Sequence, residues 1–256
     1  IKEEYKDLVQ ELLSLSENVS TNKERLKLLL RDDYFSLKNT LEERINKIIE
    51  NYPDSISFFS DLVEARIELP DKDYSNFYEI INHLAIAHPV LSRTLLQYIV
   101  DDFPDQSCHF ASLIKGNCSD NEFFYYIIDK IWQIDLECCK AAVIWMLTRG
   151  RNQDIKLYKN EDLDYFEYIV ENKMLSAIGP TYFTLSKYIL INPKRTLEVI
   201  AGILRLCGNN TDAGFLLHSI FENKEIIESH SDLIKDFVLK DTIEFPIDSH
   251  YIEDIL

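Results

Sequence analysis

The cysteines are the residues of this chain best suited to chemistry, and their spacing limits what that chemistry could be. There are five of them: Cys108, Cys118, Cys138, Cys139 and Cys207. The odd count, the adjacent pair and the lack of any Cys-x-x-Cys spacing argue against a disulfide framework and against a zinc site. The adjacent pair lies in LECCKAAVIWMLTRG (136–150). This stretch is either a reactive thiol site or the packed interior of a larger fold.

The residues around the adjacent cysteines favour packing. Between Cys138 and Leu147 only Lys140 is charged, so a helix here has a narrow polar face and is expected to be buried on most sides. Neighbouring residues of a helix point about 100° apart, which makes a joint site from Cys138 and Cys139 poor in geometry. Free cysteine commonly behaves as a small buried hydrophobe. We therefore predict that both cysteines are buried and react slowly, and that Trp145 is a large buried aromatic.

Other residues of catalytic type do not form a recognisable motif. His83 and His88 are five residues apart, and Cys108 and His109 are neighbours, but neither pair matches a metal-binding spacing. Glycine-rich phosphate loops and the Gly-x-Ser-x-Gly elbow are absent from the sequence. We predict no catalytic, cofactor-binding or metal-binding residues, no cofactor, and no enzymatic activity. The sequence assigns no partner-binding residues.

The charge balance limits the class of partner. There are 27 basic and 44 acidic residues, for a net charge of −17. Nucleic-acid binding requires clustered Lys and Arg to neutralise phosphates, so we expect no nucleic-acid partner. Lys23, Lys27 and Arg31 line one face of a predicted helix and could meet anionic lipid, but three cations are fewer than the usual cluster of about 4–8. We interpret them as a solvated face.

Apolar spacing predicts an all-α fold. The chain of 256 residues holds only 6 glycines and 7 prolines, and its apolar residues recur at i, i+3 and i+4. No apolar run approaches the roughly 20 residues that cross a bilayer, so we expect a soluble protein. Ile1 in place of methionine suggests a segment of a longer chain. Helices are predicted near 3–16, 22–31, 34–51, 55–68, 73–87, 90–103, 106–115, 120–134, 136–149, 161–173, 176–191, 194–207, 212–222 and 224–240.

Three of these helices resemble one another. PVLSRTLLQYIVDDFP (89–104), DLECCKAAVIWMLTRG (135–150) and PKRTLEVIAGILRLCG (193–208) carry apolar residues at matching inner positions. The interval between the starts of the first two segments, at residues 89 and 135, fits the repeat length of HEAT and armadillo units, which is about 40–47 residues. The second interval is longer, and the polar stretch RNQDIKLYKNED (151–162) can account for the excess. We predict one right-handed α-solenoid of HEAT/armadillo-like helix pairs spanning residues 1–256.

Aromatic residues gather on several predicted helices, at Phe58-Phe59, Phe123-Phe124-Tyr125-Tyr126 and Tyr165-Phe166-Tyr168. Packing between helices explains most of them. Tyrosines beside a groove could instead anchor a partner peptide or helix. The sequence leaves both alternatives open.

Residues 111–240 resemble the α-solenoid trunk of the large β-type subunits (adaptins) of vesicle-coat adaptor complexes. The resemblance rests on KAAVIWML (140–147), TLSKYILINPKRTLEVIAGIL (184–204) and GFLLHSIFENKEIIESHSDLIKDFVL (214–239), in that order and at similar spacing. It implies a non-catalytic scaffold in intracellular protein transport. The implied partners are sister coat subunits, cargo motifs and a small GTPase, in a hetero-oligomer. The implied location is the cytoplasm, with peripheral contact to Golgi or endosomal membranes. The alternative is a HEAT-like scaffold or assembly chaperone in a nuclear or proteasomal complex.

Overall fold

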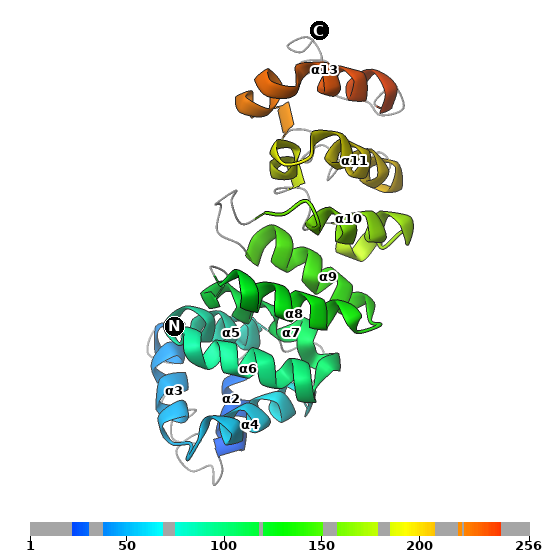
Figure 1. The fold of residues 1–256 in the computed structure, drawn as a ribbon. Helices are drawn as coiled ribbons and strands as arrows, with labels where there is room; N and C mark the ends of the chain where they lie inside the picture. The colour runs from blue at the N-terminus through cyan, green and yellow to red at the C-terminus, as the bar shows by residue number, and fades with distance from the viewer. Residues whose placement is uncertain are drawn as a thin grey trace, which may run out of the picture. The chain divides into compact units, whose positions relative to one another are not determined.

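The computed structural model describes residues 22–30, 38–68, 75–117, 120–150, 158–178, 185–207, 220–221 and 223–241, and all regular structure in these ranges is helical (Figure 1). The all-α prediction is therefore confirmed for the described residues. The chain divides into two compact units, Ile1–Gln106 and Ser107–Leu256, which are described separately. In the described ranges, no helix combines the length and apolar character needed to cross a bilayer.

The described residues of the first unit form five α-helices. They are α2 (Asn22–Leu30), α3 (Lys38–Glu50), α4 (Ser55–Glu68), α5 (Ser75–Ala87) and α6 (Pro89–Asp102), followed by the short 3₁₀-helix η2 (Pro104–Gln106). Helix α2 contacts α3, α4 and α5, while α6 packs on α4 and α5. Buried Phe58, Phe59 and Phe77 contribute to the apolar core of this unit.

The cation stripe predicted on α2 pairs with acids of the same unit. Lys23 Nζ lies 2.5 Å from a carboxylate oxygen of Glu64 and 2.9 Å from one of Glu68, both on α4. Lys27 also pairs with Glu68. Arg31 lies outside the described residues. Lys23 and Lys27 remain partly exposed, and their pairs with Glu64 and Glu68 also link α2 to α4.

The described residues of the second unit form a second series of helical elements. In chain order they are α7 (Ser107–Phe110), the 3₁₀-helix η3 (Ala111–Asn117), α8 (Asn121–Gln133), α9 (Glu137–Trp145), the π-turn η4 (Met146–Gly150), α10 (Asp162–Glu171), the 3₁₀-helices η6 (Leu175–Ala177) and η8 (Leu185–Leu190), α11 (Pro193–Cys207) and α13 (Lys224–Asp241), which is kinked at His230. Helix α8 packs on α9, α9 on α10, α10 on α11, and α11 on α13. Elements that are neighbours in the sequence are therefore neighbours in this unit.

Sequence signals account for several helix boundaries. The Asp120 carboxylate accepts a hydrogen bond from the Phe123 amide at 3.1 Å and caps α8. Before α11, the Asn192 side chain accepts from the Arg195 amide at 3.2 Å, and Pro193 occupies the first helical position. Both arrangements satisfy an amide that has no partner within the helix. The predicted boundary at Asn192-Pro193 is confirmed.

The matching positions of the three similar segments are nearly all buried. Leu96, Ala142 and Ile200 are buried, and so are Ile99 with Ile203 and the set Val100, Met146 and Leu204. The exception is Trp145, which is only partly buried. The similarity therefore reflects a shared core-facing stripe. The prediction that Trp145 is an internal aromatic was wrong.

Two predicted helices differ from the structure. Within the predicted helix 106–115, only Ser107–Phe110 is α-helical, and Ala111–Asn117 forms the 3₁₀-helix η3. The described parts of 176–191 are the 3₁₀-helices η6 and η8, in place of a single α-helix. The predicted helix 3–16 and most of 212–222 lie outside the described residues.

Helix α10 ends in a left-handed turn at a residue that is not glycine. Lys173 has φ 56°, and the amides of Lys173 and Met174 donate to the carbonyls of Val170 (3.2 Å) and Ile169 (3.0 Å). These two bonds form a Schellman cap, a position where glycine avoids the steric cost of the left-handed conformation.

We therefore expect Lys173→Gly to raise the free energy of unfolding by about 0.5–1 kcal/mol, because relief of the steric cost exceeds the added freedom of the unfolded chain. Chemical denaturation measures this change. The control is Glu171→Gly, two residues earlier in helical conformation, which should lower stability by about 1 kcal/mol. Equal losses in both variants would contradict the capping role of Lys173.

Candidate functional site

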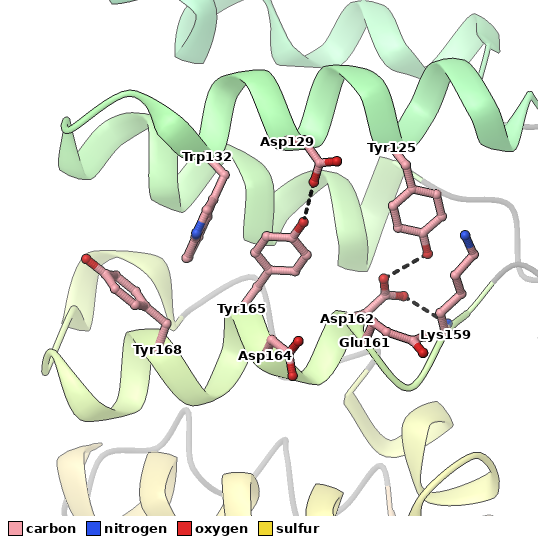
Figure 2. A pocket seen from close by; sticks show the side chains of 9 residues that line it. All are labelled: Tyr125, Asp129, Trp132, Lys159, Glu161, Asp162, Asp164, Tyr165 and Tyr168. Carbon is pink, nitrogen blue, oxygen red and sulfur yellow. Dashed lines mark hydrogen bonds between the residues drawn. The ribbon is translucent and has the colours of Figure 1, made fainter.

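An open cleft of about 760 Å³ lies in the second unit between α8 and the beginning of α10 (Figure 2). Helix α8 contributes residues at i, i+4 and i+7, so they share one face. The other wall comes from α10 and the turn before it. The lining residues are Tyr125, Asp129, Trp132, Lys159, Glu161, Asp162, Asp164, Tyr165 and Tyr168.

The buried carboxylate of Asp162 joins three segments at one end of the cleft. It accepts hydrogen bonds from the hydroxyl of Tyr125 at 2.8 Å and from the hydroxyl of Tyr188 at 3.0 Å. It also accepts one from the backbone amide of Lys159 at 3.0 Å. Tyr125 belongs to α8 and Tyr188 to η8, so Asp162 fixes the start of α10 against both. This end of the cleft is preorganised.

The centre of the cleft is a tyrosine–tryptophan surface. The Tyr165 hydroxyl donates to Asp129 at 2.8 Å. Burial, together with this hydrogen bond, raises the pKa of Tyr165 well above its usual value, so the hydroxyl remains protonated. The Trp132 ring stands edge-on to Tyr165 and Tyr168, with centroid distances of 4.7 and 5.0 Å. These edge-to-face contacts orient the three rings into one aromatic wall. Tyr168 is 38% exposed.

Lys140 supports this wall from α9. Its Nζ lies 4.7 Å from the Trp132 ring centroid and 5.8 Å from that of Tyr168, and it donates to the Trp132 carbonyl. Only 8% of Lys140 is exposed. The prediction that Lys140 marks the narrow polar face of this helix is wrong. Lys140 is buried because its ammonium contacts a carbonyl and two aromatic rings inside the unit.

Arg195 of α11 fixes the outer edge of the acidic wall. Its guanidinium makes a two-point contact with Glu167, at 2.5 and 2.6 Å, and also pairs with Asp164. A third donor reaches the Asn160 carbonyl at 3.1 Å. The paired carboxylates hold the pKa of Arg195 above its usual value. The edge of α10 is therefore held in one position relative to α11.

The balance of charge in the cleft is acidic. Four carboxylates line it, against the single cation of Lys159, whose Nζ lies 3.6 Å from the Tyr125 ring centroid (Figure 2). The side chain of Asp164 is 68% exposed. None of the nine lining residues is a serine, cysteine or histidine. This arrangement suits the binding of cationic and apolar groups by carboxylates and aromatic faces.

Sequence reasoning named these tyrosines but did not place them in one site. A usable signal existed in the spacing. Tyr125, Asp129 and Trp132 are at i, i+4 and i+7, and Glu161, Asp164, Tyr165 and Tyr168 have the same helical periodicity. Both faces mix aromatic and acidic residues, whereas the core-facing stripes are mainly apolar. That the two faces oppose each other could not be read from the spacing.

The cysteines are placed differently from the prediction. Cys139 is buried, but Cys138 is exposed, so the expectation that both are internal was wrong for Cys138. The structure also brings Cys108 to this pair, with all three sulfur atoms within 4.8 Å of one another. Cys207 is partly buried on α11, and Cys118 lies outside the described residues.

The two histidines considered for a metal share a single amide instead. His83 and His88 both contact the side-chain oxygen of Asn46, with Nε2 to Oδ1 distances of 3.2 and 2.8 Å. Their rings are 5.8 Å apart and meet edge to face. The contacts link α3 to α5 and to the start of α6, which is a packing role.

A scan against family models, a search of curated proteins and a search of solved structures give no match to this chain.

Proposed function

We propose that this chain is a non-catalytic helical scaffold whose cleft between α8 and α10 binds a basic segment of another protein. The observation that carries this proposal is the combination, in one open cleft, of exposed carboxylates with a wall of Trp132, Tyr165 and Tyr168 in edge-to-face contact. Preorganised aromatic side chains are favoured anchors at protein interfaces, because little entropy is lost when they bind.

The order of the helices supports a scaffold. In the second unit, α8, α9, α10, α11 and α13 follow one another in contact (Figure 1). Stacked helices of this kind bury a continuous core and leave long surfaces for partners. We propose that the unit is an α-solenoid, as the repeat pattern predicts.

Charge selects the occupant. The net charge of the chain is −17, and the cleft itself is acidic. A segment carrying Arg or Lys next to an apolar side chain would pair with Asp129, Glu161 and Asp164 while its apolar group contacts the aromatic wall. Exposed ion pairs contribute about 0–1 kcal/mol each, so the aromatic contact supplies most of the affinity and the charges supply selectivity.

Short labelled peptides with Arg or Lys beside aromatic or aliphatic residues test this proposal, against a set with Glu in the basic positions. We expect the basic set to bind, with affinity falling as salt rises. Trp132→Ala should weaken binding roughly 30-fold, as expected for an anchor of about 2 kcal/mol. Fluorescence anisotropy gives the dissociation constants.

Matched variants distinguish peptide binding in the cleft from binding elsewhere on the surface. Trp145→Ala removes the other tryptophan, which does not line the cleft, and should leave affinity unchanged. Glu161→Lys should weaken binding and reduce its salt dependence, whereas Glu198→Lys, on an exposed part of α11, should not. Equal binding of the basic and acidic sets, or equal effects of both tryptophan variants, would refute the proposed cleft.

We further propose a vesicle coat as the setting, supported by the likeness of residues 111–240 to adaptin trunks. In that setting the chain co-purifies in equal amounts with a second large subunit and moves to membranes when an activated small GTPase is added. Recovery with nuclear or proteasomal components would favour the alternative assembly role. Either outcome leaves the cleft proposal to be tested separately.

A further inference from the structure

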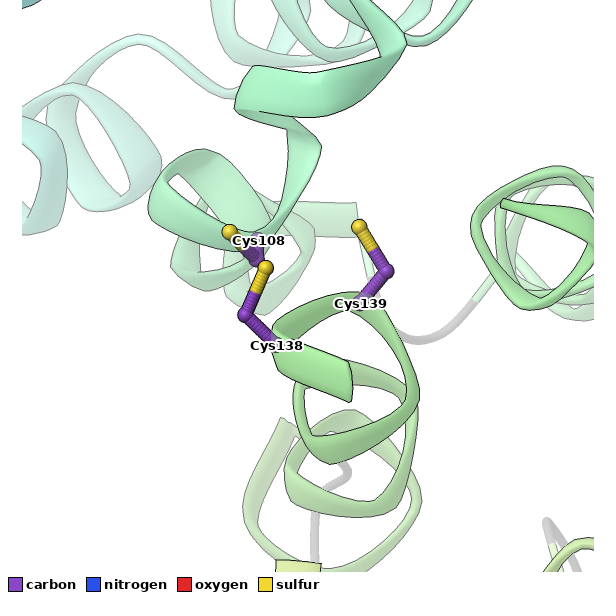
Figure 3. A group of neighbouring side chains, drawn as sticks. All are labelled: Cys108, Cys138 and Cys139. Carbon is purple, nitrogen blue, oxygen red and sulfur yellow. The ribbon is translucent and has the colours of Figure 1, made fainter. Parts of the chain in front are cut away.

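Three thiols from two helices converge in the second unit (Figure 3). None of them lines the aromatic cleft. Cys138 and Cys139 lie in the first turn of α9, and Cys108 comes from α7. Each sulfur lies within 4.8 Å of the other two. The side chains of Cys138 and Cys139 point in different directions from α9. The three thiols come together because Cys108 of α7 lies between these two directions.

This spacing is close to that of a metal site. Zinc–sulfur bonds are about 2.3 Å long, so thiolates around a tetrahedral zinc lie about 3.8 Å apart. The sulfur atoms would have to approach one another by about 1 Å or less to reach that geometry. Small side-chain rotations allow a shift of this size. The site is graded in burial, from buried Cys139 through half-buried Cys108 to exposed Cys138.

We propose that Cys108, Cys138 and Cys139 form a three-thiolate site for a thiophilic cation of the Zn²⁺ class. Soft thiolates select such ions over Mg²⁺ or Ca²⁺. The exposed side, next to Cys138, provides the entry path and leaves the fourth position to water. The ion would join α7 to the beginning of α9, and so link the first helices of this unit.

Without an ion, the thiols of Cys108 and Cys138 are held in their protonated form. The hydrogen bond with Cys139, together with burial, raises the pKa of Cys108 to about 12. Burial and the hydrogen bond with Cys108 raise the pKa of Cys138 to about 11. Three close thiolates repel one another unless a cation lies between them, so metal binding displaces their protons and strengthens with rising pH.

The test uses the full chain, reduced and metal-free, titrated with Zn²⁺ in competition with a chromophoric chelator. We expect one ion per chain with a dissociation constant below about 1 µM, and no comparable binding of Mg²⁺. Co²⁺ should give a thiolate-to-metal charge-transfer band. Removing a residue that hydrogen-bonds to a metal ligand lowers metal affinity by about 10–100-fold. Cys108→Ser and Cys138→Ser each remove a ligand itself, so each should lower the affinity for Zn²⁺ by more than about 100-fold.

Cys207→Ser is the control, because this partly buried cysteine lies on α11, outside the cluster. Cys138→Ser is the decisive variant, since an exposed position should tolerate serine, and unchanged circular dichroism verifies its fold. The proposal is overturned if Zn²⁺ binds no tighter than Mg²⁺, if Cys138→Ser binds like the parent, or if Cys207→Ser loses as much affinity. Ready formation of a disulfide within the cluster without any metal affinity would also overturn it.

Discussion

Replacing Asp162 by alanine should lower the free energy of unfolding by about 3–5 kcal/mol, because three hydrogen-bond donors lose their buried acceptor at a cost of about 1–3 kcal/mol each. The carboxylate is fully buried and accepts from two tyrosine hydroxyls and one backbone amide. Alanine removes the acceptor from all three donors at once. Guanidinium denaturation followed by circular dichroism measures the loss.

Two further variants show whether the cause is the network or the position. Asp162→Asn keeps the shape of the side chain but leaves only one acceptor oxygen. We therefore expect an intermediate loss of stability, about 1–3 kcal/mol. Glu161→Ala alters the exposed neighbour and should change stability by less than about 0.5 kcal/mol. If Asp162→Ala were no worse than Glu161→Ala, Asp162 would not hold α8, η8 and α10 together.

Gly202→Ala should also destabilise the protein, although alanine is the better helix former. A Cβ at Gly202 of α11 would lie 2.5 Å from Cγ1 of Val170 on α10. Overpacking of this kind costs about 1–3 kcal/mol, and the gain from removing a helical glycine is about 0.5–1 kcal/mol. We expect a net loss of about 1–2 kcal/mol in chemical denaturation.

A double-mutant cycle with Val170→Ala isolates the cause. In the Val170→Ala background the clash is gone, so Gly202→Ala should become stabilising and its effect should change sign. If Gly202→Ala had the same effect in both backgrounds, α10 and α11 would not approach each other at this point. The cycle therefore tests directly the contact between α10 and α11.

The helices could be predicted because local signals determine them. Apolar periodicity and boundary residues such as Asn192-Pro193 fixed most of the described helices to within a few residues. The segment 176–191 failed because its apolar pattern is compatible with 3₁₀ as well as α-helical structure, and tertiary packing decides between them.

The functional surfaces could not be predicted because they depend on contacts between helices. On α9, spacing alone placed Lys140 outside and Cys138 inside, the reverse of what is found. Lys140 is buried because Trp132 of α8 offers it a carbonyl and an aromatic face. Cys108 meets Cys138 and Cys139 only because α7 packs on α9. Trp132 lies in a different helix from Lys140, and Cys108 lies in a different helix from Cys138 and Cys139.

The central claim is that a basic segment occupies the cleft, and the fluorescence of Trp132 tests it most directly. The chain has two tryptophans, so Trp145→Phe leaves Trp132 as the single reporter. We predict that basic peptides change its emission in a saturable, salt-sensitive way, while charge-reversed peptides do not. Emission that stays constant with basic peptides, or that changes equally with both sets, would contradict the account.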